Sequence, residues 1–138
     1  MARARKEDHS AHRLILDSGA VIALARGDRR AFTFLALSLE FRTPIEIPVV
    51  VVAETSRGGP RDAPINRLLK AVGSVPTTHE IHGRTAGRLL AAARSAYTVD
   101  ALVVAHAVEG GGAHILTGDR DDLERLSAQH PEVVIHSL

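Results

Sequence analysis

Four acidic residues stand at the ends of apolar segments or inside them. Asp17 directly follows the segment RLIL, and Asp119 follows HILT after a single glycine. Glu54 lies within VVVVAET and Asp100 within TVDALVVAHA, and apart from Arg57 neither segment has a basic residue within one helical turn of its acid. A buried carboxylate without a partner is costly, so it needs a proton, a cation or a basic group. We therefore expect the four acids to share a divalent cation.

The ligands that these acids offer are hard oxygens, which favour Mg²⁺ or Mn²⁺ over zinc. Mg²⁺ usually keeps several waters, which leaves room for a phosphate oxygen and an attacking water. A bound ion of this kind lowers the pKa of a water and neutralises charge on a phosphate, so the pattern indicates phosphodiester hydrolysis. We expect Asp17, Asp100 and Asp119 to bind one or two ions, with Glu54 as a further ligand or as the base that receives the proton of the water.

Each acid also has a purely structural interpretation. An Asp at a strand end is a common turn residue or helix N-cap, which applies to Asp17 and Asp119. Asp100 is a candidate helix cap, and Glu54 is a candidate partner of Arg57 in a surface salt bridge. These interpretations stay open for each residue taken alone, and only the four acids together require a cation.

Short apolar strands alternate with helices along the chain. The patterns predict strands at 13–16, 45–47, 114–117 and 133–135, an edge strand at 74–77, and helices at 18–26, 29–39, 64–72, 80–93, 99–108 and 121–129. Residues 49–56 fit a helix that begins after Pro48, although their β-branched side chains favour a strand. This alternation is typical of a parallel sheet covered on both faces, whose ligands bind beyond the carboxyl ends of the strands. If the strands before Asp17 and Asp119 are neighbours, both carboxylates face one crevice.

The composition indicates a globular chain without cysteine chemistry. It has 138 residues, 45% of them hydrophobic, a net charge of +1 and no cysteine. We expect the polar, basic residues 1–12 to be disordered and residues 13–138 to form one domain. The apolar segments are too short to cross a bilayer, so we expect a soluble, cytoplasmic protein. With only four aromatic residues, we do not expect a stacking platform of the kind that single-strand binders use.

Four segments, in this order and spacing, resemble the motifs of the PIN-domain family, and in particular the VapC toxins of bacterial toxin–antitoxin pairs. The segments are LDSGAVIAL, VVVVAETSRG, TVDALVVAHA and ILTGDRDDL. The resemblance implies a three-layer α/β/α sandwich with a central, mainly parallel sheet. It implies a Mg²⁺- or Mn²⁺-dependent endoribonuclease that acts on RNA, forms a homodimer and is blocked by a VapB-like antitoxin. The basic lead-in and the glycines Gly83 and Gly87 before Asp100 are departures from the family pattern.

The resemblance also implies roles for individual residues. The acidic quartet would be Asp17, Glu54, Asp100 and Asp119. Ser18 and Thr117 match hydroxyl residues that would orient carboxylates or waters. Asp122 matches an auxiliary acid, and a solvated helix position accounts for it equally well.

Two rival functions fit parts of the same pattern. A haloacid-dehalogenase-like phosphatase would use Asp17 as nucleophile and the GDRDD segment as metal acids. That chemistry needs a second Asp at position 19, which is Gly, and a central lysine, for which Lys70 is poorly placed. A non-catalytic PIN-like module would bind RNA or protein without metal, and the complete quartet argues against it.

Overall fold

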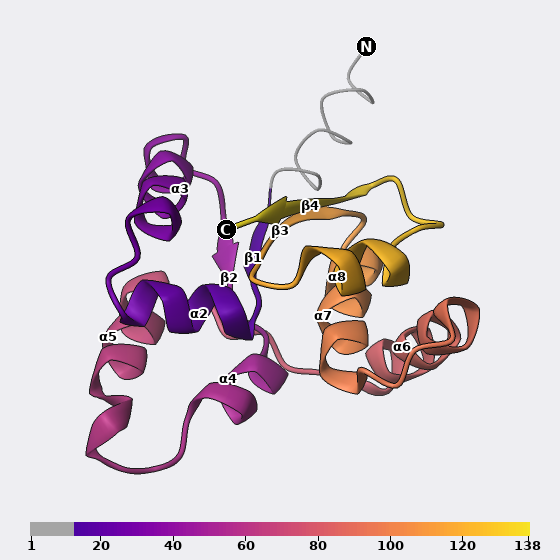
Figure 1. Cartoon of the computed structure of the whole chain (residues 1–138), viewed down its shortest axis with the longest axis horizontal. Helices are drawn as coiled ribbons and strands as arrows, with labels where there is room; N and C mark the ends of the chain where they lie inside the picture. The colour runs from indigo at the N-terminus through magenta and orange to yellow at the C-terminus, as the bar shows by residue number, and fades with distance from the viewer. Residues whose placement is uncertain (1–12) are drawn as a thin grey trace.

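The sheet at the centre of the molecule is parallel throughout. The computed structural model describes residues 13–138, and within them β1 (Leu14–Leu16), β2 (Ile45–Glu46), β3 (Ala113–Thr117) and β4 (Val133–Ser137) form one sheet in the order β2-β1-β3-β4 (Figure 1). All three residues of β1 are buried, as expected of a central strand in a covered sheet. The predicted disorder of residues 1–12 lies outside the described residues, so the division of the chain at residue 13 stays a prediction.

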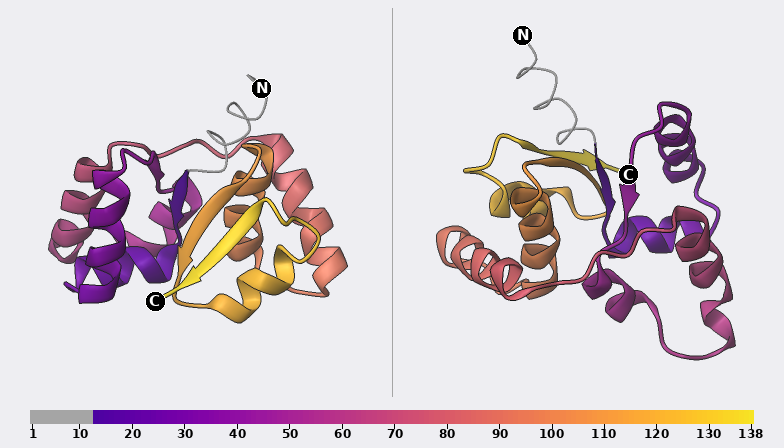
Figure 2. Two further views of the ribbon diagram at one scale, coloured as in Figure 1. Left: turned by 90° about the horizontal axis from the view of Figure 1, so that it is seen from above. Right: turned by 180° about the vertical axis from the view of Figure 1, so that it is seen from behind.

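Helices cover both faces of this sheet, which confirms the predicted three-layer arrangement. The helical elements are α2 (Ser18–Ala25), α3 (Arg29–Glu40), α4 (Val49–Thr55), the 3₁₀ turn η1 (Pro60–Asp62), α5 (Ala63–Val72), α6 (Glu80–Ala93), α7 (Thr98–Glu109) and α8 (Arg120–Leu126). Helices α2, α3 and α5 lie on one side of the sheet, and α6, α7 and α8 lie on the other (Figure 2). No helix in residues 13–138 is long and apolar enough to cross a membrane.

The order of the strands creates a crevice between β1 and β3. The chain moves outward from β1 to β2 on one side and from β3 to β4 on the other, so the segments that leave the carboxyl ends of β1 and β3 diverge (Figure 1). Open α/β sheets bind ligands at such a switch point. The two connections meet closely, because a Cβ atom on Gly19 would lie 3.0 Å from the amide nitrogen of Gly118.

The four valines before Glu54 form a helix rather than a strand. Pro48 precedes the first turn of α4 with a φ of −57°, and its carbonyl accepts from the amide of Val51 at 2.9 Å. The side chain of Val51 is fully buried in the core. The helix prediction is therefore confirmed and the competing strand is wrong, because packing of one helical face outweighs the intrinsic preference of β-branched residues.

The predicted edge strand at 74–77 does not form. Its backbone runs beside the segment that follows β2, where the carbonyl of Ser74 accepts from Ile47 (3.0 Å) and that of Pro76 accepts from Val49 (3.1 Å). Pro76 has no N–H with which to continue a ladder, and Val49 already begins α4. The pairing therefore stops after two hydrogen bonds.

The side chain of Arg13 joins the start of β1 to β2 and to the end of α7. Its Nη1 donates to Glu46 Oε1 (2.6 Å), and its Nη2 donates to the carbonyls of His106 (2.9 Å) and Ala107 (3.2 Å). The side chains of Arg13 and Glu46 are only 17% and 20% exposed. Removing the guanidinium would leave a shielded carboxylate and the end of α7 without their partner.

We predict that Arg13→Ala lowers the free energy of unfolding by about 2–3 kcal/mol, because one member of a shielded, hydrogen-bonded pair is lost. Urea denaturation followed by circular dichroism measures the change. Arg84→Ala is the control, since it breaks a pair with Glu80 whose side chains are 68% and 80% exposed. It should cost at most about 1 kcal/mol. Equal losses in the two variants would contradict the prediction.

Candidate active site

Asp17 occupies the crevice as the N-cap of α2. Its Oδ1 accepts from the amide of Ala20 at 2.9 Å, and its Oδ2 accepts from the hydroxyl of Thr117. The residue is only 5% exposed. Burial raises the pKa of Asp17 above its usual value, although hydrogen bonds from Thr117, Ala20 and Gly118 act in the opposite direction. The capping interpretation is therefore correct, and the same carboxylate also lies where a ligand would bind.

Thr117 connects Asp17 to the next acid. The Thr117 hydroxyl donates to Asp17 and its oxygen accepts from the amide of Asp119 at 2.8 Å. Asp119 is the residue before α8, and its side chain makes no capping hydrogen bond. Thr117 is fully buried at the end of β3. Its two hydrogen bonds therefore fix the segment after β1, with Asp17, relative to the segment after β3, with Asp119.

Three acids, from the first turn of α7 and from the start of α8 with the residue before it, converge beside Asp17. One carboxylate oxygen from each of Asp100, Asp119 and Asp122 lies within 4.8 Å of the other two. Asp100 is in the first turn of α7 and Asp122 in the first turn of α8. Burial, followed by repulsion from Asp17 and Asp119, raises the pKa of Asp100 to about 6. A hydrogen bond with Asp119 is the main cause that raises the pKa of Asp122.

Glu54 reaches the same region from the last turn of α4. Its side chain is exposed, and its Oε1 accepts from the hydroxyl of Ser18 at 2.5 Å. Its charge contributes to the raised pKa of Asp100, which places the two groups near each other. The alternative of a salt bridge with Arg57 is wrong, because the Arg57 guanidinium donates to the backbone carbonyls of Ser56 and Ala53 instead.

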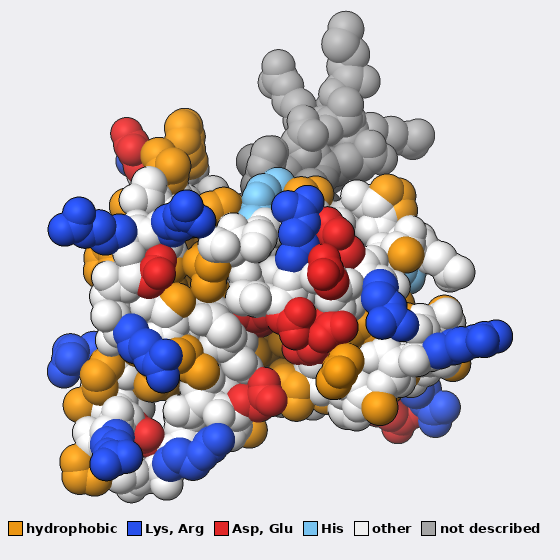
Figure 3. All heavy atoms as spheres, in the orientation of Figure 1, with side chains coloured by type: hydrophobic (Ala, Val, Ile, Leu, Met, Phe, Trp, Pro, Cys, Tyr) orange, Lys and Arg blue, Asp and Glu red, His pale blue; other side chains and the backbone are white. Residues whose placement is uncertain are grey.

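None of these acids forms an ion pair within residues 13–138, although the charge of Arg125 acts on Asp122. Within residues 13–138 the ion pairs are Arg13–Glu46, Arg84–Glu80, Arg120–Glu124 and His130–Glu132. Acidic side chains gather in the middle of one face of the molecule, with basic side chains around them (Figure 3). Closely spaced carboxylate oxygens without ion-pair partners are a suitable ligand set for a hard dication such as Mg²⁺ or Mn²⁺.

A comparison with protein-family models matches residues 14–129 to the PIN domain. The chain belongs to the PIN-domain family. This membership agrees with the resemblance of the four sequence motifs and sets aside the haloacid-dehalogenase-like alternative. No curated protein matches the chain.

Several solved structures share the fold of this PIN domain. VapBC2 from Rickettsia felis, bound to a DNA fragment from its promoter, has 16% identity and a TM-score of 0.66 over 91% of this chain and 98% of that one. A toxin–antitoxin complex from Klebsiella pneumoniae has 19% identity and a TM-score of 0.65 over 88% and 95%. FitAcB from Neisseria gonorrhoeae has 16% identity and a TM-score of 0.62 over 88% and 95%. Identities this low establish the fold alone.

Histidines of the PIN domain form a separate, structural cluster. His79 precedes α6, and its amide donates to Nδ1 of His82 at 2.9 Å in a reciprocal cap of the helix. The ring of His82 stacks on that of His106, with centroids 4.0 Å apart. Burial, together with the charges of His82 and Arg13, lowers the pKa of His106 to about 4. The contact between His79 and His82 therefore caps the start of α6.

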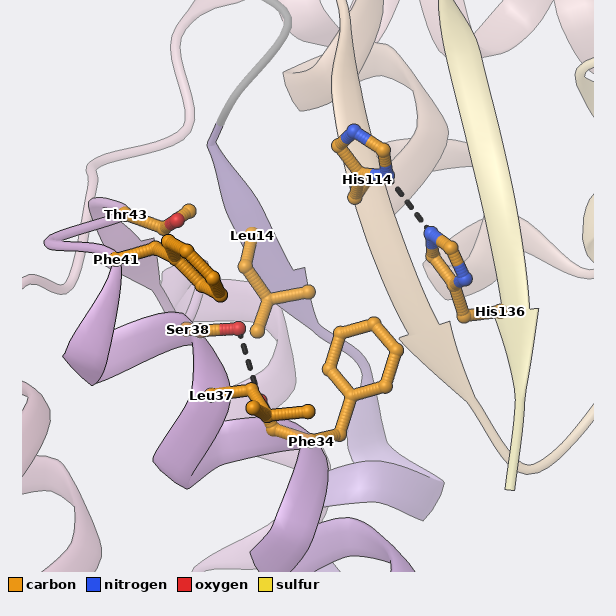
Figure 4. A pocket seen from close by; sticks show the side chains of 8 residues that line it. All are labelled: Leu14, Phe34, Leu37, Ser38, Phe41, Thr43, His114 and His136. Carbon is orange, nitrogen blue, oxygen red and sulfur yellow. Dashed lines mark hydrogen bonds between the residues drawn. The ribbon is translucent and has the colours of Figure 1, made fainter.

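A hollow of about 240 Å³ lies on the PIN domain away from the acids. Figure 4 shows it between the second half of α3 and the sheet, with the hydrogen-bonded rings of His114 and His136 on the sheet side (Nδ1 to Nε2, 2.7 Å). Its lining includes Leu14, at the start of β1, whereas Asp17 follows the end of that strand. The hollow contains none of the predicted site residues.

One buried acid was not singled out by the sequence patterns. Asp62 is 7% exposed, and its carboxylate accepts from the amides of Arg57 (2.9 Å) and Gly58 (2.7 Å). It fixes the turn after α4 and so supports the position of Glu54. The signal for this role is the sequence RGGPRD, in which an Asp follows a glycine turn.

Proposed function

We propose that this PIN domain is a divalent-metal-dependent endoribonuclease and the toxin of a VapC-type toxin–antitoxin pair. The observation that carries the proposal is the convergence of Asp100, Asp119 and Asp122 beside the buried Asp17, with no ion pair to any of them within residues 13–138. The family assignment and the toxin–antitoxin origin of the similar structures support it.

The residues that would hold a Mg²⁺ or Mn²⁺ ion are Asp17, Asp100 and Asp119, with Glu54 or Asp122 beside them. When bound, the ion supplies charge neutralisation on the phosphate and a water of lowered pKa. Thr117 keeps Asp17 directed at the crevice by its hydrogen bond, and Ser18 restrains Glu54 in the same way. Glu54 is exposed, so its carboxylate is suited to accept the proton of an attacking water.

The proposed substrate is RNA and the proposed protein partners are a second copy of the chain and a VapB-like antitoxin that covers the acids. Hydrolysis by an external water does not use the ribose 2′-hydroxyl, so a preference for RNA must come from the shape of the strand. Exposed arginine side chains after α2, in α3, after α4 and in η1 are the candidates for phosphate contacts. They are Arg26, Arg29, Arg30, Arg57 and Arg61, and none of them forms an ion pair within the described residues.

The test is cleavage of an end-labelled RNA by the purified chain in Mn²⁺. We expect internal cuts in Mn²⁺, none after addition of EDTA, and recovery when excess Mn²⁺ is restored. A DNA strand of the same sequence is the matched control and should be cut more slowly. RNA binding without cleavage, unchanged by Mn²⁺ or EDTA, would instead identify a non-catalytic binding module and end the proposal.

A further inference from the structure

Tyr97 presents an exposed aromatic ring at the entrance to the acidic site. It lies directly before α7, three residues ahead of Asp100, and it is 56% exposed. Its amide donates to Ser95 Oγ at 3.1 Å, and its carbonyl accepts from the amide of Ala101 at 3.0 Å. Both backbone polar groups of Tyr97 are thus hydrogen-bonded, which fixes the position of the backbone from which the ring extends.

The fold makes no visible use of this ring. Within residues 13–138 it takes part in no aromatic pair, and its hydroxyl has no hydrogen-bond partner. A tyrosine ring carries a large apolar surface that is favourable to bury. Its exposure next to the acids leaves this apolar surface free to pack against a bound molecule.

The hollow in front of Tyr97 offers uncharged surface to a neutral ring next to the acids. Its volume is about 290 Å³, and Glu54 and Asp100 line one part of it. In the proposed function these two acids would serve the metal ion and the attacking water. The rest of the lining is Ala96, Tyr97, Thr98 and Val99, which carry no charge and suit an uncharged base.

We infer that this hollow is a nucleobase subsite, in which the ring of Tyr97 stacks on one base beside the cleaved phosphodiester. The inference rests on the proposed function, because a phosphate held at Asp100 places a neighbouring nucleotide within reach of a ring one helical turn away. Any base can stack on an aromatic side chain, provided that it is not stacked on or paired with another base.

The test compares Tyr97→Ala and Tyr97→Phe on one single-stranded RNA in Mn²⁺. Tyr97→Ala should raise KM by about 5- to 100-fold with a much smaller change in kcat, and Tyr97→Phe should keep the wild-type KM, because the ring rather than the hydroxyl stacks. Phe41→Ala is the matched control, since Phe41 is 77% exposed but lines the distant hollow of Figure 4. It should leave both constants unchanged.

Abasic substrates identify the base concerned. RNAs that lack the base at one position next to the cut, each position in turn, are cleaved by the wild type and by Tyr97→Ala. At one position the loss of the base and the loss of the ring should not add, because each removes the same contact. Additive effects at every position, or a wild-type KM for Tyr97→Ala, would overturn the inference while leaving the nuclease intact.

Two further measurements distinguish base stacking from a role of Tyr97 in the metal site or in a protein interface. Mn²⁺ binding by calorimetry should be the same for Tyr97→Ala and the wild type, and a large loss would assign the ring to the metal site and overturn the inference. Sedimentation should give the same oligomeric state for both proteins. A changed oligomeric state with an unchanged KM would assign the ring to a protein interface and overturn the inference. Absence of any Mn²⁺-dependent cleavage by the wild type would overturn the proposed function together with it.

Discussion

Replacing Asp17 with asparagine is expected to slow RNA cleavage by at least about 100-fold, because a metal ion stabilises the charge of such a transition state by several kcal/mol. The fold should survive, since asparagine is as good an N-cap as aspartate and can still accept from the amide of Ala20. Initial rates on a labelled RNA in Mn²⁺, with circular dichroism of both proteins, measure the two effects.

Asp28→Asn is the matched control for this prediction. Asp28 caps α3 as Asp17 caps α2, and its side chain accepts from the amide of Ala31 at 3.0 Å. It is exposed and lies at the far end of α2 from the acids, so its replacement should leave kcat unchanged. Equal rates for the wild type and Asp17→Asn would dismiss the proposed mechanism.

The melting temperature of Asp17→Asn should also show whether Asp17 serves only the fold or also binds a metal ion. Because burial raises the pKa of Asp17, its charged form destabilises the metal-free protein at neutral pH. In EDTA the variant should therefore melt at the same temperature as the wild type or higher. Mn²⁺ should raise the melting temperature of the wild type more than that of the variant, as expected for a ligand that binds the native state.

The position of the first and last acids could be predicted because it depends on local geometry. Asp17 and Asp119 follow strands, and parallel neighbouring strands bring their carboxyl ends to one edge. The helix at Val49–Thr55 was also predictable from Pro48, although its valines favour a strand. The fold class and these elements are confirmed, whereas the catalytic roles of the acids stay a prediction that the variants above test.

Other features depend on how helices pack, which a local pattern does not contain. Asp122 joins Asp100 and Asp119 because of the direction in which α8 leaves the crevice. The bond from Ser18 to Glu54 requires α4 to pack beside α2. The exposure of Tyr97 follows from the connection between α6 and α7, and a count of aromatic residues gives no sign of it.

Replacing Asp100 with asparagine is expected to remove a specific pH dependence of stability. The pKa of Asp100 is raised from 3.8 to about 6, so the folded, metal-free protein binds a proton there more tightly than the unfolded chain does. Its contribution is most favourable below pH 3.8 and is lost as the pH rises through about 6. In EDTA, the unfolding free energy of Asp100→Asn relative to the wild type should increase between these pH values and level off above them.

The pH dependence has to be measured as the difference in unfolding free energy between Asp100→Asn and the wild type, because His106 changes the stability of both proteins with pH in the opposite direction. Its pKa is lowered from 6.5 to about 4, so its contribution to stability is lost as the pH falls through the same range. Both proteins share that effect, and subtraction removes it.

A bound dication should replace the proton on the acids. Mn²⁺ affinity of the wild type should then fall by up to about tenfold for each pH unit below 6, with proton release on binding measured by calorimetry in buffers of different ionisation enthalpy. In saturating Mn²⁺ the ion should further stabilise the wild type by binding its native state. A stability difference that does not vary with pH, or Mn²⁺ binding without proton release at pH 6, would mean that Asp100 is not repelled by its acidic neighbours and does not share an ion with them.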